Sequence, residues 1–179
     1  MTWKEIKPSF KFLARFLAFY LVANILYGWW ITSFSPKADP VTVSETHQSA
    51  FILGITGFDD VKTMAHPSKP AERIMLGERP VLAVYEGCNG INVWIIFAGF
   101  LFAFGGLKKN VLIFIGIGSL IIYVINLGRI LFLFFIALNY PNSLYFFHKY
   151  FFTAGLYMVV FALWYFWIKR YGQQVAAAK

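Results

Sequence analysis

Long apolar runs make up most of the chain, and one polar segment interrupts them. The apolar runs cover about residues 12–34, 89–107, 111–127 and 149–168, whereas residues 35–87 carry most of the polar side chains. A run of roughly 20 apolar residues is long enough to cross a bilayer as a helix. The pattern therefore predicts an all-α integral membrane protein, a single membrane domain spanning 1–179, with about four transmembrane helices and one small segment outside the bilayer.

The apolar stretch 130–147 has two interpretations. A fifth crossing there would move Lys169 and Arg170 to the side opposite the other basic flanks, so we place the stretch as an outer-leaflet or re-entrant segment. The alternative is that the third helix continues past Arg129 to about Asn139, tilted or bent. Hydrophobic periodicity is compatible with both.

The polar segment contains its own secondary-structure signals. The sequence "VSETHQSAFILGITGF" has apolar positions and a terminal Gly that suit a short amphipathic helix at the membrane surface. Farther along, "ERIML" and "PVLAVYE" read as strands joined by "GERP", which predicts a β-hairpin that leads directly into Cys88.

Composition and charge support a membrane protein and set its orientation. Hydrophobic residues make up 59% of the chain and charged residues only 13%, which excludes an ordinary soluble domain. The net charge of +8 is not a nucleic-acid footprint, because the basic residues flank the apolar runs. These flanking residues are Lys4, Lys7, Lys11, Lys108, Lys109, Lys169 and Arg170.

The positive-inside rule places both termini and the Lys108–Lys109 connection in the cytoplasm. Seven of the eight acidic residues lie between Asp39 and Glu86. We therefore expect an N-in, C-in topology in which residues 35–87 are extracytoplasmic.

With this topology, three residues that carry reactive or charged groups fall at the same membrane face. Cys88 opens the second helix, Arg129 closes the third, and His148 opens the fourth. The orientation was set by other residues, so the convergence is independent evidence for a shared site. His47 and His66 also lie outside but are not tied to a helix end, and we treat them as surface residues.

The three side chains suit nucleophilic catalysis. The positive end of a helix favours the thiolate form of a cysteine at its start. His148 can accept a proton near neutral pH and return it to a leaving group. Arg129 stays charged and suits stabilisation of a thiolate, an oxyanion or a substrate carboxylate. Asn89 and Gly90 are candidate substrate-binding residues, because an Asn can bond locally to backbone and a Gly permits close approach of a substrate backbone.

Each of these residues also has an ordinary structural interpretation. A lone Cys is commonly a small core residue, an Arg near a helix end commonly extends to the lipid headgroups, and a His at an interface is commonly an anchor. The rival hypothesis is a non-catalytic small membrane protein, such as an assembly factor or transporter subunit, with the three side chains far apart.

A single cysteine excludes an internal disulfide framework, a CxxC redox pair and a multi-cysteine zinc site, and it disfavours a thiol–quinone oxidoreductase.

The order of Cys in "CNGINVW", Arg in "NLGRILF" and His in "FFHKYFF" resembles the exosortase and archaeosortase family, most closely its exosortase F subgroup. The resemblance covers about residues 72–168. It implies a membrane cysteine transpeptidase or protease with Cys88 as nucleophile, Arg129 as the essential arginine and His148 as the catalytic histidine.

The resemblance also implies partners and a location. The expected substrates are exported proteins with a C-terminal sorting signal, with membrane lipids around the enzyme and a lipid-linked or glycan group as an acceptor. The expected location is the bacterial cytoplasmic (inner) membrane, with the active site facing the periplasm. The chemistry requires no metal or organic cofactor, and no nucleic acid is expected as a partner.

Overall fold

The computed structural model describes residues 3–177, and describes side chains for residues 7–171. Within residues 3–177, six α-helices, a three-stranded sheet and three short helical turns follow one another. The main helices are α1 (Trp3–Thr32), α2 (Pro40–Ile55), α3 (Ile91–Gly105), α4 (Lys109–Asn139) and α6 (Phe152–Ala177), and the strands are β1 (Val61–Ala65), β2 (Ala71–Leu76) and β3 (Arg79–Tyr85). The short elements are η1 (Glu86–Cys88), η2 (Pro141–Ser143), α5 (Leu144–Phe146) and the π-helical turn η3 (Phe147–Phe151).

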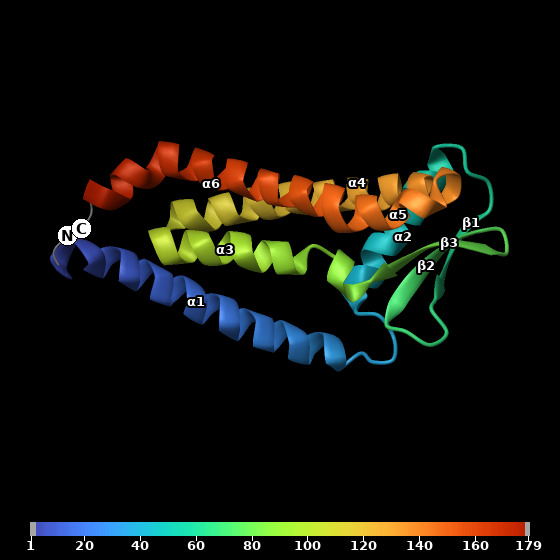
Figure 1. Ribbon diagram of the computed structural model, residues 1–179, viewed down its shortest axis with the longest axis horizontal. Coiled ribbons are helices and arrows are strands. Elements are labelled where there is room, and N and C mark those ends of the chain that lie inside the picture. The colour runs from blue at the N-terminus through green and yellow to red at the C-terminus, as the bar shows by residue number, and fades with distance from the viewer. Residues whose placement is uncertain (1–2, 178–179) are drawn as a thin grey trace.

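Four long helices run alongside one another, and the sheet and α2 lie at one end of them (Figure 1). Within the described residues, three helical segments are long and apolar enough to cross a membrane: Lys7–Thr32, Lys109–Asn139 and Pro141–Tyr171. The fourth apolar helix, α3, has only 15 residues, which corresponds to about 22 Å at 1.5 Å per residue and falls short of the roughly 30 Å hydrocarbon core. A membrane protein is confirmed, whereas a fourth complete crossing remains a prediction.

The interpretation of 130–147 as a separate re-entrant segment is wrong. Helix α4 continues without interruption from Lys109 to Asn139, as in the alternative interpretation, and only Pro141 and the residues after it form separate short turns. The helix continues because "ILFLFFIALN" contains no Gly or Pro. Its outer half also packs on the sheet and α2, which buries Ile130, Leu133, Phe134 and Ala137 in protein, whereas Phe132 and Phe135 are exposed.

The polar segment folds as a small layer over the end of the helices. The predicted short helix is confirmed as α2, and the predicted hairpin is confirmed as β2 and β3 joined through Gly77. Strand β1 was not predicted. It pairs antiparallel with β2, which becomes the central strand of the order β1-β2-β3.

Two hydrophobic clusters hold the molecule together. The outer cluster joins α2, the hairpin and the second half of α4, and consists of Leu53, Ile74, Leu82, Val84, Ile130, Leu133, Phe134 and Ala137. The inner cluster joins α3, α4 and α6, and consists of Phe97, Ala98, Leu101, Val111, Ile115, Ile122, Val160 and Trp167. Helix α4 contributes to both, so it is the element that connects the membrane bundle to the extramembrane layer.

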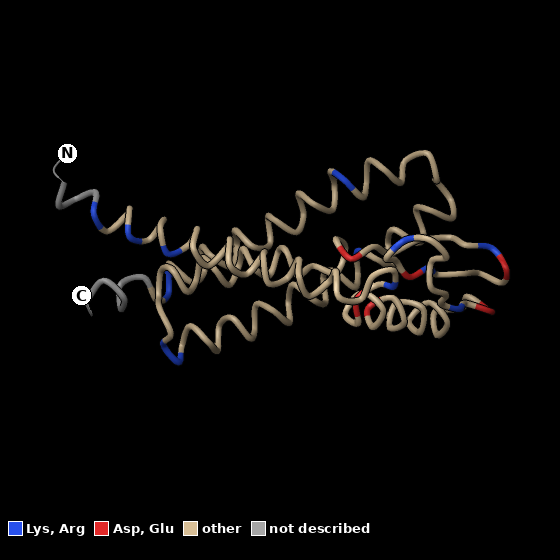
Figure 2. The backbone as a smooth tube through the Cα atoms, turned by 90° about the horizontal axis from the view of Figure 1, so that it is seen from below, with Lys and Arg blue, Asp and Glu red and all other residues tan. Residues whose placement is uncertain are grey.

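The charges divide between the two ends of the molecule. Among residues 7–171, whose side chains the structure describes, acidic side chains gather at the end that carries the sheet, and the opposite end carries basic residues only (Figure 2). The start of α1, the α3–α4 connection and the end of α6 share that basic end (Figure 1). This arrangement supports the predicted topology, in which all three lie on one side of the membrane.

Close packing of α3 against α4 depends on Gly118. A Cβ at this position would lie 2.2 Å from the ring of Phe97, which is fully buried. A Cβ at Gly116, one half-turn earlier, would meet nothing within 4 Å. Of the two glycines in "GIGS", Gly118 therefore permits close helix packing and Gly116 does not contribute to it.

We expect Gly118→Ala to lower the apparent melting temperature of the detergent-solubilised protein, because the added methyl group displaces the Phe97 ring at a cost of about 1–3 kcal/mol. Gly116→Ala is the matched control, and it should leave the melting temperature unchanged or raise it slightly. Equal effects of the two substitutions would contradict the packing assignment.

Candidate catalytic site

Cys88 lies in a tight turn between the sheet and α3. It is the last residue of η1, directly after strand β3, and α3 begins three residues later at Ile91. The sequence-based expectation that Cys88 itself opens the helix is therefore wrong. The residue immediately before the helix is Gly90, with φ of 73°, and the Asn89 side chain accepts a hydrogen bond from the Ile91 amide at 3.1 Å.

The thiol of Cys88 contacts the imidazole of His148. Sγ and Nε2 are 3.0 Å apart, although the residues are 60 positions apart in the sequence. His148 is in η3, the π-helical turn that precedes α6. Both side chains are half-buried. This is the nucleophile–base arrangement that activates a cysteine when the imidazole accepts its proton.

Arg129 lies in the same region on α4, and its residue is only 8% exposed. Its guanidinium is close enough to His148 to act on the imidazole electrostatically. Within the part of the chain that the structure describes, no carboxylate forms an ion pair with it, and its one side-chain hydrogen bond is a long one of 3.4 Å from Nη1 to Oδ1 of Asn126. A buried guanidinium with unused donors is suited to bind an anionic group.

The position of Arg129 along α4 indicates the depth of the site. It lies 20 residues after Lys109, the first residue of the helix. At 1.5 Å per residue this is about 30 Å, the thickness of the hydrocarbon core. With Lys109 at one membrane surface, Arg129 and its neighbours therefore reach the other surface.

Asn126 was missed by the sequence analysis. It lies one turn before Arg129 and is fully buried. Its amide nitrogen donates to the carbonyl oxygen of Cys88 at 2.8 Å and to Oε2 of Glu45 at 2.9 Å. A single Asn within an apolar helical run was the available signal, because a buried amide requires partners.

Glu45 on α2 is the other residue that the sequence analysis missed, and it is only 1% exposed. The pKa of Glu45 is raised to about 8, chiefly by burial and also by the negative charge of Asp39, and this net value includes the opposing effects of the Asn126 hydrogen bond and the Arg129 charge. Its second oxygen, Oε1, has no hydrogen-bond partner among the described residues. Glu45 is therefore a neutral carboxylic acid at pH 7, with Oε2 accepting from Asn126.

Asn89 connects three helices around the Cys88 turn. Its amide nitrogen lies 2.9 Å from the hydroxyl of Tyr27 on α1 and 3.3 Å from Oδ2 of Asp39, the residue that caps α2. Thr42 also donates to Asp39 Oδ2, at 2.5 Å. Asp39, Thr42 and Asn89 are all buried, so the side-chain amide of Asn89 is engaged by the protein itself.

A cavity of about 410 Å³ adjoins this network between α2, α3 and α4. Its lining includes Glu45, Asn89, Gly90, Trp94, Ser119 and Tyr123. Apolar side chains supply most of the remaining wall, so the cavity suits a largely apolar group with a few polar contacts.

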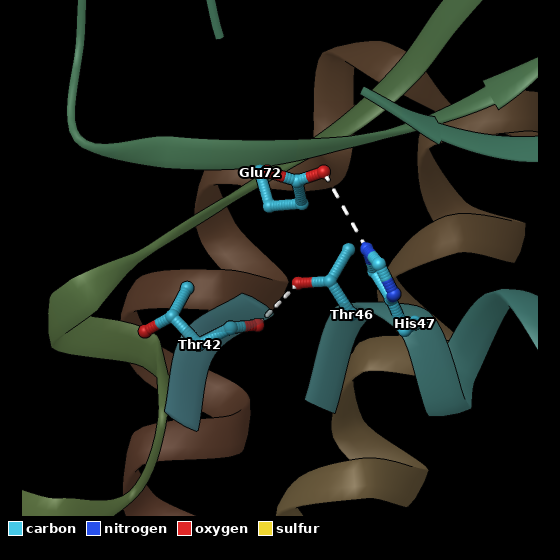
Figure 3. A network of polar contacts seen from close by, with 4 residues as sticks. All are labelled: Thr42, Thr46, His47 and Glu72. Atoms are coloured by element: carbon cyan, nitrogen blue, oxygen red, sulfur yellow. Dashed lines mark hydrogen bonds and ion pairs between the residues drawn. The ribbon is translucent and has the colours of Figure 1, made fainter. Parts of the chain in front are cut away.

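The other two histidines form contacts with other parts of the extramembrane layer. Figure 3 shows His47 on α2 facing Glu72 of β2, with 3.8 Å between Nε2 and Oε1, beside a hydrogen bond from Thr46 to the Thr42 carbonyl. The imidazole is largely exposed, so this pair adds little stability. His66 accepts a local hydrogen bond from the Ser68 amide.

The chain matches the family model described as transmembrane exosortase over residues 7–168. The matched range includes Glu45, Cys88, Asn126, Arg129 and His148 and, apart from residues 169–171, all three candidate membrane-spanning segments. No curated protein and no solved structure matches the chain significantly.

The raised pKa of Glu45 predicts a pH-dependent stability. The unfolded chain releases this proton near pH 4.5 and the folded protein near pH 8. The folded state therefore holds the extra proton between these values, and stability falls as pH rises through that window, by at most on the order of 5 kcal/mol. The apparent melting temperature in detergent should decline from about pH 5 to about pH 8, and Glu45→Gln should remove most of that decline.

The matched control is Glu78→Gln, because Glu78 is exposed at the hairpin turn. This substitution should leave the pH profile of the wild type unchanged. A Glu45→Gln profile that runs parallel to the wild type would show that Glu45 is ionised in the folded protein.

Proposed function

The chain belongs to the transmembrane exosortase family, and on this premise we propose that it is a membrane cysteine transpeptidase or protease, most like the exosortase F subgroup. Its substrates are exported proteins with a C-terminal sorting signal. Cleavage takes place at the outer face of the bacterial cytoplasmic membrane, with the active site toward the periplasm. The observation that carries the proposal is the 3.0 Å contact between Cys88 Sγ and His148 Nε2, with the buried Arg129 close by.

The reaction is acyl transfer through a thioacyl enzyme. His148 accepts the thiol proton, and the thiolate of Cys88 attacks the carbonyl carbon of the scissile peptide. The tetrahedral intermediate collapses as the C–N bond breaks, and His148 returns the proton to the leaving amine. Water or an amine then attacks the thioester, which restores the thiol and gives hydrolysis or transpeptidation.

Arg129 supports the charged states of this reaction. Its guanidinium remains protonated throughout, so it serves as an electrostatic group and not as a base. Its low exposure and unused hydrogen-bond donors favour binding of the oxyanion, where a charge is worth more than in water.

Asn89 and Gly90 form the substrate-binding part of the proposal. Both line the cavity between α2, α3 and α4, and both directly follow Cys88 in the chain. We assign that cavity to the substrate segment beside the scissile bond. A lipid-linked or glycan amine would reach the thioester from the periplasmic side.

The rival hypothesis of a non-catalytic membrane protein expects Cys88, Arg129 and His148 to be far apart. The contact between Cys88 and His148 opposes it. Cys88 also packs against the outer hydrophobic cluster, as a structural cysteine would, but a structural cysteine would need no imidazole partner.

Cys88→Ala should accumulate full-length substrate when the enzyme is co-expressed with an exported protein that carries a C-terminal sorting signal. His148→Ala should do the same, and Arg129→Lys should slow processing about a hundredfold, because an ammonium keeps the charge but loses the planar set of donors. Processing is measured by the size shift of the substrate on immunoblots.

Lys149→Ala is the matched control, because Lys149 is exposed and directly adjacent to His148. It should process substrate at the wild-type rate. Normal processing by Cys88→Ala would refute the assignment of Cys88 as nucleophile.

A second experiment tests which membrane face carries the site. Because the chain has only one cysteine, a membrane-impermeant maleimide added outside spheroplasts should label the wild type and leave Cys88→Ala unlabelled. Lys108→Cys in the Cys88→Ala background, which places the single cysteine in the α3–α4 connection, should react only after the membrane is permeabilised. Labelling in the opposite order would reverse the proposed topology.

A further inference from the structure

The side chain of Asn126 forms hydrogen bonds with three groups in and around the proposed site. It lies on the same helix as Arg129, one turn earlier, and it does not touch the thiol or the imidazole. Its three hydrogen bonds reach the Cys88 carbonyl, the Glu45 carboxyl group and the Arg129 guanidinium. We propose that Asn126 is a positioning residue that fixes both the Cys88 turn and Arg129, and that Glu45 of α2 anchors it.

The donors of Asn126 serve two groups that have to be held in place. The hydrogen bond of 2.8 Å to the Cys88 carbonyl fixes the backbone of the residue whose thiol faces His148. The second hydrogen bond, of 2.9 Å from Asn126 Nδ2 to Glu45 Oε2, fixes the orientation of the amide. Because both acceptors take hydrogen bonds from Nδ2, the carbonyl oxygen Oδ1 must face the other way, toward Arg129.

The surroundings of the amide favour this role. Gly90 has a left-handed backbone with φ of 73°, and a Cβ there would lie 3.4 Å from Cγ of Asn126. The turn backbone at Gly90 therefore packs directly beside the amide of Asn126, and its positive φ is what favours glycine there. Asn126 and Glu45 are both almost completely buried, so loss of either would leave the other with an unmet hydrogen bond in a low-dielectric region.

The inference gives a function to α2, because it connects the extramembrane layer to the proposed nucleophile. Glu45 is held near the amide by a helix that is capped by Asp39 and packed on the sheet. A displacement of α2 would release Asn126, and with it both Cys88 and Arg129. The effect of α2 on catalysis rests on the proposed function. The placement of the Cys88 turn by Asn126 does not depend on that function.

The first test uses processing of the reporter substrate by the full-length enzyme in proteoliposomes. Asn126→Leu has nearly the same volume and makes no hydrogen bond, so it should lower kcat about tenfold or more while KM changes little, because apolar docking of the substrate is retained. Glu45→Leu should act in the same way, and Glu45→Gln should restore kcat, because its amide oxygen still accepts from Asn126.

The double variant Glu45→Leu/Asn126→Leu should be no slower than the slower single variant, because the two residues act as one unit. Asn139→Leu is the control: Asn139 is exposed near the end of the same helix and bonds only to the Phe135 carbonyl. Additive losses, or an unchanged kcat in Asn126→Leu with a wild-type melting temperature, would overturn the inference.

The second test does not depend on any substrate. The alkylation rate of Cys88 by iodoacetamide at neutral pH should fall about fivefold in Asn126→Leu, because a thiol displaced from its imidazole partner is less reactive. The rates should be equal for all variants in sodium dodecyl sulfate. An unchanged native rate would overturn the inference. If alkylation falls while Cys88→Ala still processes the substrate, the positioning role stands and the proposed function fails.

Discussion

The hydrogen bond from the Asn126 amide to the Cys88 carbonyl is the contact on which the site depends. It joins a turn that follows the sheet to the middle of the longest helix, two parts of the chain that are 38 residues apart. Both groups are polar and lie where water is scarce, so each would cost free energy without the other. The position of the thiol is thus set by a side chain that takes no part in the chemistry.

The arrangement gives the extramembrane layer a structural role. The outer cluster packs α2 and the hairpin against the second half of α4 with apolar side chains. Their polar neighbours Asp39, Thr42 and Asn89 form hydrogen bonds with one another, and Glu45 accepts a hydrogen bond from Asn126. Apolar packing provides the stability of the layer, and the polar network fixes where the Cys88 turn lies.

The site also shows how a membrane protein places a charge near lipid. Arg129 is shielded by α4 and its neighbours, and the described carboxylate nearest to it in the network, that of Glu45, is held neutral by burial. A permanent ion pair would occupy the guanidinium and weaken its interaction with an oxyanion. The neutral acid keeps the hydrogen-bond geometry and leaves the positive charge available.

The sequence by itself determined the features that follow from local pattern and from the chemistry of single residues. The apolar runs gave the membrane helices, the alternation around "GERP" gave the hairpin, and the basic flanks gave a shared end for both termini. Tertiary structure alone decided the extent of α4 beyond Arg129, the strand β1, and the partners Asn126 and Glu45. Periodicity measures only whether a position is apolar, whereas the end of a helix and the role of a buried amide depend on groups that are distant in the chain.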